Sequence, residues 1–356
     1  MKKVLFVLCM LCCLIMIGCS MGHTHSYDKM NSDENEHWKE CGCGAKTEIE
    51  AHNWDNGVIT KEATETEEGI KLYTCAVCGK TKEAKMDKLV PSTGLDIVVK
   101  DDYAILKGIG TCTDINIVVP KTFNNIPITT INDRAFFNNK TIESIIIQNN
   151  VTSIGSESFS LCVALKEVII YNGVTKMGYN AFESCKSLIN IILPDSITSI
   201  GNNAFEGCES LKSITLPKGL KTISPSMFLS CTALKSVIIP DGITSIGNKA
   251  FKDCAVLENV SLPNGITIIG DMSFQSCKSL DNVTLPGTLK TIGYLAFSKC
   301  AFSTIIIPIS VTKIGNMAFA PLSSLTVYCE AQSKPDAWDN EWAYIETQVV
   351  WGYTPD

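Results

Sequence analysis

Residues 188–210 read LINIILPDSITSIGNNAFEGCES, and variants of this 23-residue stretch follow one another along most of the 356-residue chain. A phenylalanine recurs at the position of Phe205 and a cysteine at the position of Cys208. The cysteines keep one interval over seven consecutive copies, at Cys162, Cys185, Cys208, Cys231, Cys254, Cys277 and Cys300. Self-similarity at such a period predicts a solenoid, in which each repeat stacks on the last and none can bury its core alone.

The first part of each copy has the pattern of a short strand. Ile191 and Leu193 alternate with Asn190 and Ile192, so one pair faces the core and the other faces outward. Pro194 ends this strand because proline has no N–H to donate. The pattern therefore predicts one strand of this kind in every repeat.

The rest of each copy predicts a second extended piece and a turn of helix. Ile197 and Ile200 form the next apolar pair. Phe205, Cys208 and Leu211 lie three apart, as residues do on one face of about one helical turn. We therefore expect an α/β repeat solenoid that is rich in β-structure.

The repeated motif is P-x-x-I-x-x-I-G-x-x-A-F-x-x-C-x-x-L-x-x-I-x-L, and seven or eight consecutive units satisfy it with few departures. These residues resemble the BspA-type leucine-rich repeats found on bacterial cell-surface proteins and in some parasitic protists. The resemblance implies a leucine-rich-repeat solenoid over residues 95–325. It also implies an opening cap that includes 103–108 and 126–131, a closing cap over 326–356, and adhesion to host or neighbouring-cell proteins.

The chain begins with the pattern of an export signal. Two lysines precede an apolar run at 4–17, which is too short for the roughly 20 residues that span a bilayer. The run ends in Met-Ile-Gly-Cys at 16–19, which resembles a bacterial lipobox. The resemblance implies that residues 1–18 are a signal peptide and that Cys19 carries a lipid, which anchors the protein at the extracellular face of a bacterial envelope. An ordinary secretory peptide with a chance cysteine is the alternative.

The composition argues against several classes of function. The formal net charge is −7 and no basic stripe is present, so we expect no nucleic-acid partner. All four histidines lie before residue 53, which leaves none in the repeats for Ser-His-Asp or Cys-His catalysis. No phosphate-binding loop occurs, and no small-molecule substrate is evident. We therefore expect a protein that is not an enzyme and that binds another protein.

A compact segment at 37–89 contains two pairs of closely spaced cysteines, between a polar tether at 19–36 and a linker at 90–94. Cys-x-x-Cys-Gly is the geometry of a zinc knuckle, in which a tight turn aims two thiolates at one ion. A segment this short and polar needs a metal or disulfides to hold a fold. We expect a zinc-ribbon-like module with a structural zinc, and two disulfides or unpaired thiols are the alternatives.

The ligands of this zinc are open to two assignments. The first is a single all-thiolate site, and the second comprises sites that also recruit histidines. The thiolate ligands are Cys41, Cys43, Cys75 and Cys78, and the histidines are His37 and His52. The sequence His-Ser-Tyr at 25–27 echoes His-Asn-Trp at 52–54, which indicates a degenerate duplication in this part of the chain.

The cysteines of the repeats have a separate explanation. Neighbouring rungs of a solenoid lie about 4.8 Å apart, so disulfides between rungs are within reach. However, one cysteine per repeat at an identical core position, seven in all, cannot pair completely. A small buried side chain with a weak S–H donor explains the series better than a disulfide, a metal or a redox role. Asn139 takes the same position in an earlier rung, where we expect its side chain to bond the turn backbone.

The outward positions of the stacked strands form a candidate partner-binding face. Its central column is Ile146, Ile169, Ile192, Thr215, Ile238, Ser261, Thr284 and Ile306. A polar column with a single charge, Glu167, lies beside it. Contiguous apolar patches often mark interaction sites, but branched residues also favour strands wherever they point. Both explanations of the isoleucines are open at this point.

The sequence thus predicts a lipid-anchored surface protein whose repeats act as a non-catalytic adhesion or protein-binding module. A scaffold or receptor subunit within the bacterium's own envelope is the second hypothesis. An envelope enzyme with its site in the Cys/His module is the third, and it is disfavoured because four strong ligands leave a zinc ion no open position.

Overall fold

The computed structural model describes residues 25–258, 260–320, 325–344 and 347–355. These residues form two compact units that divide between Lys88 and Leu89. The signal peptide expected at 1–18 and the lipidation site expected at Cys19 lie outside the described residues. Within the described ranges, no helix is long and apolar enough to cross a membrane.

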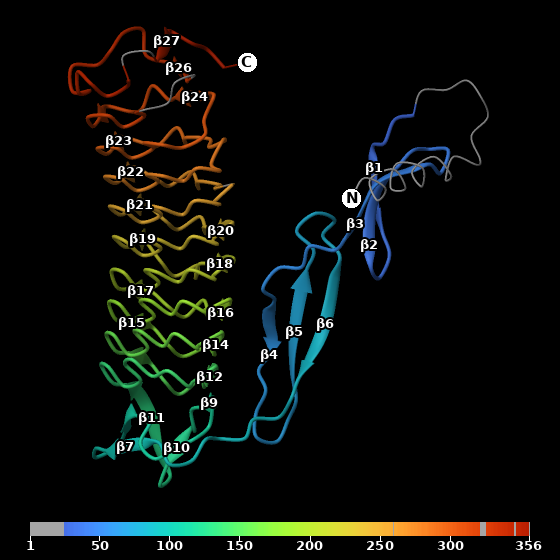
Figure 1. The fold of residues 1–356 in the computed structure, drawn as a ribbon, viewed down its shortest axis with the longest axis vertical. Coiled ribbons are helices and arrows are strands. Elements are labelled where there is room, and N and C mark those ends of the chain that lie inside the picture. Colours follow the sequence, from blue (N-terminus) through green and yellow to red (C-terminus); the bar gives the residue numbers. More distant parts are fainter. Residues whose placement is uncertain (1–24, 259, 321–324, 345–346, 356) are drawn as a thin grey trace, which may run out of the picture. The chain divides into compact units, whose positions relative to one another are not determined.

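The first unit consists of two three-stranded antiparallel sheets (Figure 1). The first sheet contains β1 (Lys29–Ser32), β2 (Glu36–Glu40) and β3 (Lys46–Ala51). The second contains β4 (Val58–Lys61), β5 (Gly69–Thr74) and β6 (Thr81–Met86). In both sheets the connection between the last two strands carries a cysteine pair, a shared layout that fits the duplication inferred from 25–27 and 52–54.

Two segments that we expected to be loose chain are ordered. The tether expected at 19–36 contains β1, which pairs with β2 over its whole length. The linker expected at 90–94 is part of the second unit, where the N–H of Ser92 donates to the carbonyl of Val118 at 2.9 Å. Polar composition suggested a tether and a linker, but composition does not report which backbone groups find a partner in a neighbouring strand.

The second unit opens with strands that cover its first rung. β7 (Asp96–Val99) and β8 (Ala104–Gly108) form an antiparallel pair, and β8 then pairs in parallel with β11 (Ile126–Ile131). β10 (Thr122–Phe123) pairs antiparallel with β11. These strands pair with an edge of the solenoid that would otherwise be unpaired.

Two columns of short parallel strands then run along the second unit (Figure 1). Strand column A contains β9 (Asn116–Val118), β12 (Ser144–Ile147), β14 (Glu167–Ile170), β16 (Asn190–Ile192), β18 (Ser213–Thr215), β20 (Ser236–Ile238) and β24 (Thr304–Ile307). Strand column B contains β11, β13 (Ser153–Ile154), β15 (Lys176–Met177), β17 (Ser199–Ile200), β19 (Thr222–Ile223), β21 (Ser245–Ile246), β22 (Ile268–Ile269), β23 (Thr291–Ile292) and β25 (Lys313–Ile314). Where strands of a column pair, equivalent residues of successive copies face each other, so the sequence period sets the register. The two copies between β20 and β24 have no strand of column A among the described residues, so the prediction of one such strand in every repeat is wrong for these two copies.

Proline sets the length of the strands in column A. The N–H of Tyr171 donates to the carbonyl of Ile147 at 2.9 Å, and β12 pairs with β14 over four residues. Pro194 takes the equivalent position one rung later and has no N–H, so β14 and β16 pair over three residues. The prediction that Pro194 ends its strand is confirmed.

The third side of each rung is built from turns, and the described residues contain no helix. In the copy at 188–210, Asn203 (φ 59°) and Gly207 (φ 69°) have left-handed backbone conformations, which a right-handed helix does not contain. The N–H of Phe205 donates to the carbonyl of Met227 in the next rung at 3.0 Å. The expected helical turn, and with it the α/β class, is therefore wrong, and the fold is a β-solenoid. Apolar residues three positions apart also face one side in successive turns whose N–H groups bond the carbonyls of the next rung.

The phenylalanines form a continuous stack inside the solenoid. Ring centroids of adjacent rungs lie 4.9–5.8 Å apart, with interplanar angles of 2–12°. The stack comprises Phe136, Phe159, Phe182, Phe205, Phe228, Phe251, Phe274, Phe297 and Phe319, each at most 2% exposed. Such ring pairs are worth about 0.5–1.5 kcal/mol each beyond the area that they bury, so the stack is a major part of the core.

Each repeated cysteine is a buried thiol that bonds the previous rung. The Sγ atom of Cys162 donates to the carbonyl oxygen of Phe136 at 3.1 Å, and the six later cysteines donate to the equivalent phenylalanines at 3.1–3.2 Å. Burial raises the pKa of Cys162 to about 12, and none of these cysteines forms a disulfide. The buried-thiol interpretation is confirmed. In the earlier rung, Oδ1 of Asn139 accepts from the N–H of Thr141 at 2.9 Å, as expected.

Aromatic residues close the other end of the solenoid. β26 (Thr326–Cys329) pairs with β24, and β27 (Gln348–Trp351) pairs with β26, which extends column A. Trp338, Trp342 and Trp351 gather with ring centroids 5.0–6.4 Å apart. Trp342 also meets Phe319, the last ring of the stack, edge to face at 6.0 Å. This cluster therefore packs against the last ring of the phenylalanine stack.

Candidate functional site

Histidines and cysteines of the first unit form two groups with the spacing of metal ligands. Among the described residues, the ligand atoms of each group lie within 4.8 Å of one another. We call the first group site 1, and it consists of His37, His52, Cys75 and Cys78. We call the second group site 2, and it consists of His25, Cys41 and Cys43.

The distances in site 1 fit a tetrahedral metal centre. Sγ of Cys78 lies 3.4 Å from Nδ1 of His52, and Sγ of Cys75 lies 4.0 Å from Nδ1 of His37. Bonds of about 2.3 Å to sulfur and about 2.0 Å to nitrogen would place tetrahedral ligand atoms about 3.5 Å apart. A metal ion therefore fits with small side-chain adjustments, and two thiolates with two imidazoles are a frequent donor set for structural zinc.

Both sheets of the first unit position site 1. His37 lies on β2, and His52 follows directly after β3. Cys75 begins the turn between β5 and β6, where the N–H of Gly79 donates to the Cys75 carbonyl at 2.9 Å. Gly79 has φ +72°, which glycine adopts without steric cost, so the turn can bring both thiols to one side.

A hydrogen bond outside the ligand set orients His52. Its Nε2 lies 2.9 Å from the carbonyl oxygen of Asp33. A carbonyl only accepts, so Nε2 carries a proton. In the neutral imidazole Nδ1, which faces Cys78, keeps its lone pair for a metal, and in the imidazolium form Nδ1 can donate to a thiolate. The same hydrogen bond raises the pKa of His52. Such a partner outside the ligand set is typical of histidines that bind metals.

The electrostatics of site 1 favour the thiolate that a metal requires. Burial by itself disfavours ionisation of Cys75, but hydrogen bonds from the backbone of Cys78 and from His52 outweigh it. Together they lower the pKa of Cys75 to about 6. The thiolate is therefore the main form of Cys75 at neutral pH, and thiolate is the form that binds metals.

The structure assembles one of the two ligand assignments made from the sequence. Cys75 and Cys78 lie with His37 and His52, whereas Cys41 and Cys43 lie in site 2. The single all-thiolate site is therefore not assembled, because the two cysteine pairs belong to hairpins of different sheets. No disulfide joins the described cysteines. The sequence prediction missed His25, although its echo of His52 in the duplicated His-x-aromatic pattern was a usable signal.

The face proposed on strand column A is partly buried in its first half. Ile146, Ile169 and Ile192 pair side by side on successive strands. Ile169 lies between the other two and is only 7% exposed, while its neighbours are half-buried. Ile169 is therefore no part of an accessible face, because isoleucines on both sides cover it.

The second half of the same column is exposed. Ile238 is 58% exposed and Ile306 is 39% exposed. The smaller residues Thr215, Ser261 and Thr284 of this half are also exposed. Ile238 pairs with Thr215, which is too small to cover it. We call these five residues the C-terminal face.

The sequence profile of the BspA type leucine rich repeat region matches residues 129–258 and 244–332, in six copies. These ranges together cover more than half of the 356 residues. The chain belongs to the BspA-type leucine-rich repeat family. The family assignment agrees with the resemblance inferred from the repeated motif, and no curated protein matches the chain in sequence.

Solved structures of leucine-rich repeat proteins from bacteria resemble this BspA-type chain. A leucine-rich repeat protein from Bacteroides ovatus is 26% identical, with a TM-score of 0.65, over 75% of this chain and 71% of its own. A leucine rich cell surface protein from Faecalibacterium prausnitzii is 22% identical, with a TM-score of 0.44, over 74% of this chain and 95% of its own. The first similarity supports a common solenoid fold.

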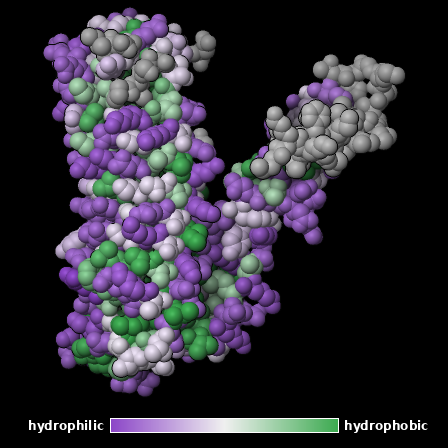
Figure 2. Space-filling view, in the orientation of Figure 1, coloured by the Kyte–Doolittle hydropathy of each residue, from purple (hydrophilic) through white to green (hydrophobic). Residues whose placement is uncertain are grey.

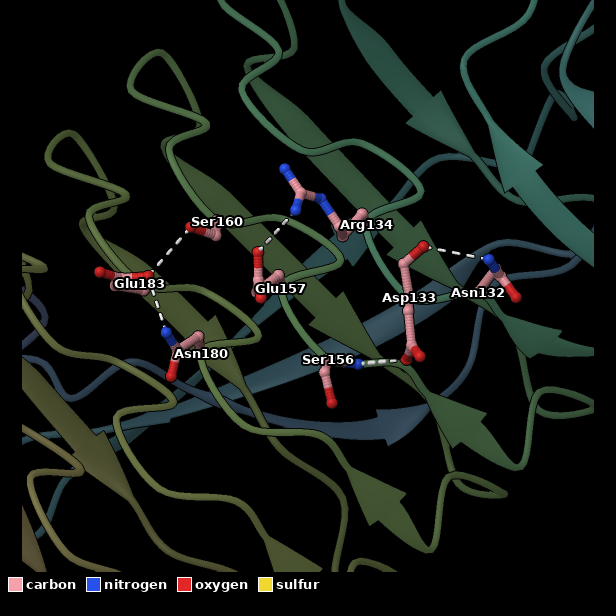
Figure 3. A network of polar contacts seen from close by, with 8 residues as sticks. All are labelled: Asn132, Asp133, Arg134, Ser156, Glu157, Ser160, Asn180 and Glu183. Carbon is pink, nitrogen blue, oxygen red and sulfur yellow. Dashed lines mark hydrogen bonds and ion pairs between the residues drawn. The ribbon is translucent and has the colours of Figure 1, made fainter.

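The turns of the BspA-type repeats carry polar side chains that bond between rungs (Figure 3). Arg134 forms an ion pair with Glu157 of the next rung at 3.6 Å. The Glu183 carboxylate accepts from Ser160 of the previous rung at 3.1 Å and from Asn180 of its own rung at 3.0 Å. These polar groups therefore stabilise the stacking of successive repeats.

The outer surface of the repeats is mixed in character. On the face that Figure 2 presents, hydrophobic residues form separate patches among hydrophilic ones. Ile268 of strand column B, which is 46% exposed, shows that single exposed isoleucines occur outside column A as well. Exposure of one isoleucine therefore does not by itself define a binding face.

Proposed function

We propose that this chain is a non-catalytic cell-surface protein that binds a protein partner on its C-terminal face. The observation that carries the proposal is the exposed series Thr215, Ile238, Ser261, Thr284 and Ile306, in which Ile238 is 58% exposed and Ile306 is 39% exposed. An exposed apolar side chain such as Ile238, next to small polar residues that do not cover it, offers a partner apolar area to bury. Membership of a family that includes cell-surface proteins supports it.

Electrostatics should contribute little to this binding. Glu167 is the single charged member of the polar column beside the face, and it accepts from Nδ2 of Asn190 at 3.2 Å. Both residues lie in the first half of column A, away from Ile238 and Ile306. We expect the affinity to depend weakly on salt, because few charges would be brought together or separated.

Matched isoleucine variants test the face. The protein is the mature chain from residue 20, made without lipid, and the partners offered are immobilised host matrix proteins and isolated bacterial envelopes. We expect Ile238→Lys to weaken capture by about tenfold or more, because a buried apolar contact becomes a buried charge. Ile268→Lys, on column B at 46% exposure, is the matched control and should bind as the parent does.

The same experiment separates the hypotheses about the partner. Capture by matrix proteins that depends on Ile238 supports adhesion, and capture by envelopes alone supports a scaffold or receptor subunit. If Ile238→Lys and Ile306→Lys fold normally and leave every capture unchanged, the C-terminal face is not the interface.

We also propose that site 1 holds a structural zinc that stabilises the first unit. Few apolar side chains of this unit are buried; they include Cys41, Ala63 and Cys75, so packing alone supplies little stability. Four ligands would leave the ion no open position, which argues against the hypothesis of an enzyme at this site. Metal analysis of the mature chain tests the proposal, and a folded first unit without metal would contradict it.

We further propose that a lipid attached to Cys19 anchors the protein at the outer face of the cell envelope. Metabolic labelling with a fatty acid should mark the full-length protein, and Cys19→Ala should remove the label and release the protein from the membrane fraction. Retention of Cys19→Ala in that fraction would contradict lipid anchoring.

A further inference from the structure

Site 2 has ligand geometry comparable to that of site 1. His25, Cys41 and Cys43 place their ligand atoms within 4.8 Å of one another. Sγ of Cys43 lies 3.4 Å from Nδ1 of His25, close to the roughly 3.5 Å expected for sulfur and nitrogen on one tetrahedral ion. A thiophilic divalent cation therefore fits at site 2 with little movement.

The turns that carry the cysteines share two features in the two sites. In site 2 the N–H of Gly44 donates to the Cys41 carbonyl at 2.8 Å, and Gly44 has φ +87°. In site 1 the N–H of Gly79 donates to the Cys75 carbonyl at 2.9 Å, with φ +72°. In both hairpins a glycine with positive φ follows the second cysteine and bonds the carbonyl of the first. The turn of site 1 is one residue longer, in keeping with Cys-x-x-Cys in place of Cys-x-Cys.

The two sites differ in ligand number and in burial. Site 1 draws His37 from the preceding sheet as its fourth ligand, whereas three residues make up site 2 within the described part of the chain. His37, His52 and Cys75 are buried, but Cys43 is exposed and His25 is half-buried. An ion at site 2 would therefore face solvent on the side of Cys43.

We propose that site 2 is a second zinc site, held by His25, Cys41 and Cys43, whose fourth coordination position is exchangeable. Binding displaces the protons of the two thiols to solvent and changes no oxidation state. The fourth position takes water, and it accepts a monodentate imidazole or thiolate from outside the chain. This inference assumes the same metal, zinc, that we propose for site 1. Variants that change the ligands of one site only test the two proposals separately.

Cobalt(II) titration of the metal-free, reduced mature chain tests the proposal, because thiolate-bound cobalt absorbs strongly in the visible and near-ultraviolet. We expect two equivalents to bind to the parent chain. Cys43→Ser should reduce the stoichiometry to one and leave the spectrum of site 1. Cys112→Ser, which changes a half-buried cysteine of the second unit, is the control and should still bind two.

Added imidazole distinguishes an exchangeable position from a closed one. It should shift the cobalt spectrum of the parent chain and leave that of Cys43→Ser unchanged. One equivalent in the parent chain that survives Cys43→Ser overturns site 2 and leaves site 1 standing. Binding of no metal at all overturns both sites. Two equivalents with no response to imidazole overturn the exchangeable position.

Discussion

Cys231 in the repeats and Cys75 in the first unit are both buried cysteines, but their pKa values are shifted in opposite directions. Cys231 is fully buried in an apolar column, where burial raises its pKa and its Sγ donates to the carbonyl of Phe205 at 3.1 Å. Cys75 is also buried, but backbone N–H groups and His52 lower its pKa to about 6. Burial therefore does not decide the role of a cysteine. The polar groups within reach of the sulfur decide it.

The two units also differ in what stabilises them. The repeats have a continuous phenylalanine stack and backbone bonds between all rungs described, whereas the first unit has two small sheets and few buried apolar residues. The repeats should therefore be stable without metal, and the first unit should need it. The predictions below test this difference, in order of decreasing effect.

Metal removal should give the largest effect. A strong zinc chelator under reducing conditions should unfold the first unit completely, because its ligands would lose the ion that we propose for site 1. The repeats should keep their unfolding temperature. Calorimetry with limited proteolysis measures both, and chelation should expose cleavage sites between residues 25 and 88. If the chelator unfolds both units, or unfolds neither, the two units do not differ in their need for metal.

Phe205→Ala should produce the next largest effect, confined to the repeats. Removing one ring from the stack leaves a cavity between Phe182 and Phe228, which lie 5.8 and 5.5 Å away. We expect a loss of about 3–5 kcal/mol in the free energy of unfolding by urea. Phe205→Leu, which fills more of the space, is the control and should cost less. A change in metal content in either variant would show that the units are not independent.

Cys231→Ala and Cys75→Ala compare the two kinds of cysteine directly. Cys231→Ala removes a small buried group and one S–H···O bond, so we expect a loss of about 1–2 kcal/mol from the repeats and an unchanged metal content. Cys75→Ala should abolish metal binding at site 1 and leave the repeats as stable as before. Zinc analysis and urea unfolding check both variants. Loss of zinc from Cys231→Ala would contradict the structural role of the repeated cysteines.

Exposed ion pairs between rungs should contribute least. Lys235 and Glu258 lie 3.2 Å apart on adjacent repeats, with side chains 63% and 45% exposed. Because solvent screens such a pair, we expect Lys235→Ala to change the free energy of unfolding by less than about 0.5 kcal/mol. If Lys235→Ala lowers the free energy of unfolding by more than about 1 kcal/mol, and the loss disappears at high salt, ion pairs between rungs stabilise the repeats more than we expect.

The sequence predicted the repeats well because one interval carried several independent signals. The period at Phe205 and Cys208 gave the solenoid, and Pro194 gave the end of a strand through its missing donor. The helical turn was wrong because apolar residues three apart fit both a helix and a pair of turns with left-handed residues. Asn203, whose φ is 59°, is compatible with such a turn, but a single sequence does not show which alternative is used.

The sites were harder to predict because they depend on which strands meet. Cys41 and Cys75 looked like partners in one site, and the pairing of the hairpins places them in two. Ile169 has an outward position like that of Ile238, yet isoleucines on both neighbouring strands cover it. His25 was overlooked because its partners lie in the hairpin between β2 and β3, which the sequence alone does not place beside it.

The most direct test of the difference between the two units is zinc X-ray absorption on the mature chain. A histidine-containing site 1 predicts both sulfur at about 2.3 Å and nitrogen at about 2.0 Å, with about two sulfurs per zinc. A shell of four sulfurs without nitrogen would contradict the ligand assignment. It would mean that cysteines which the structure keeps apart, either in two hairpins or in the repeats, share one ion.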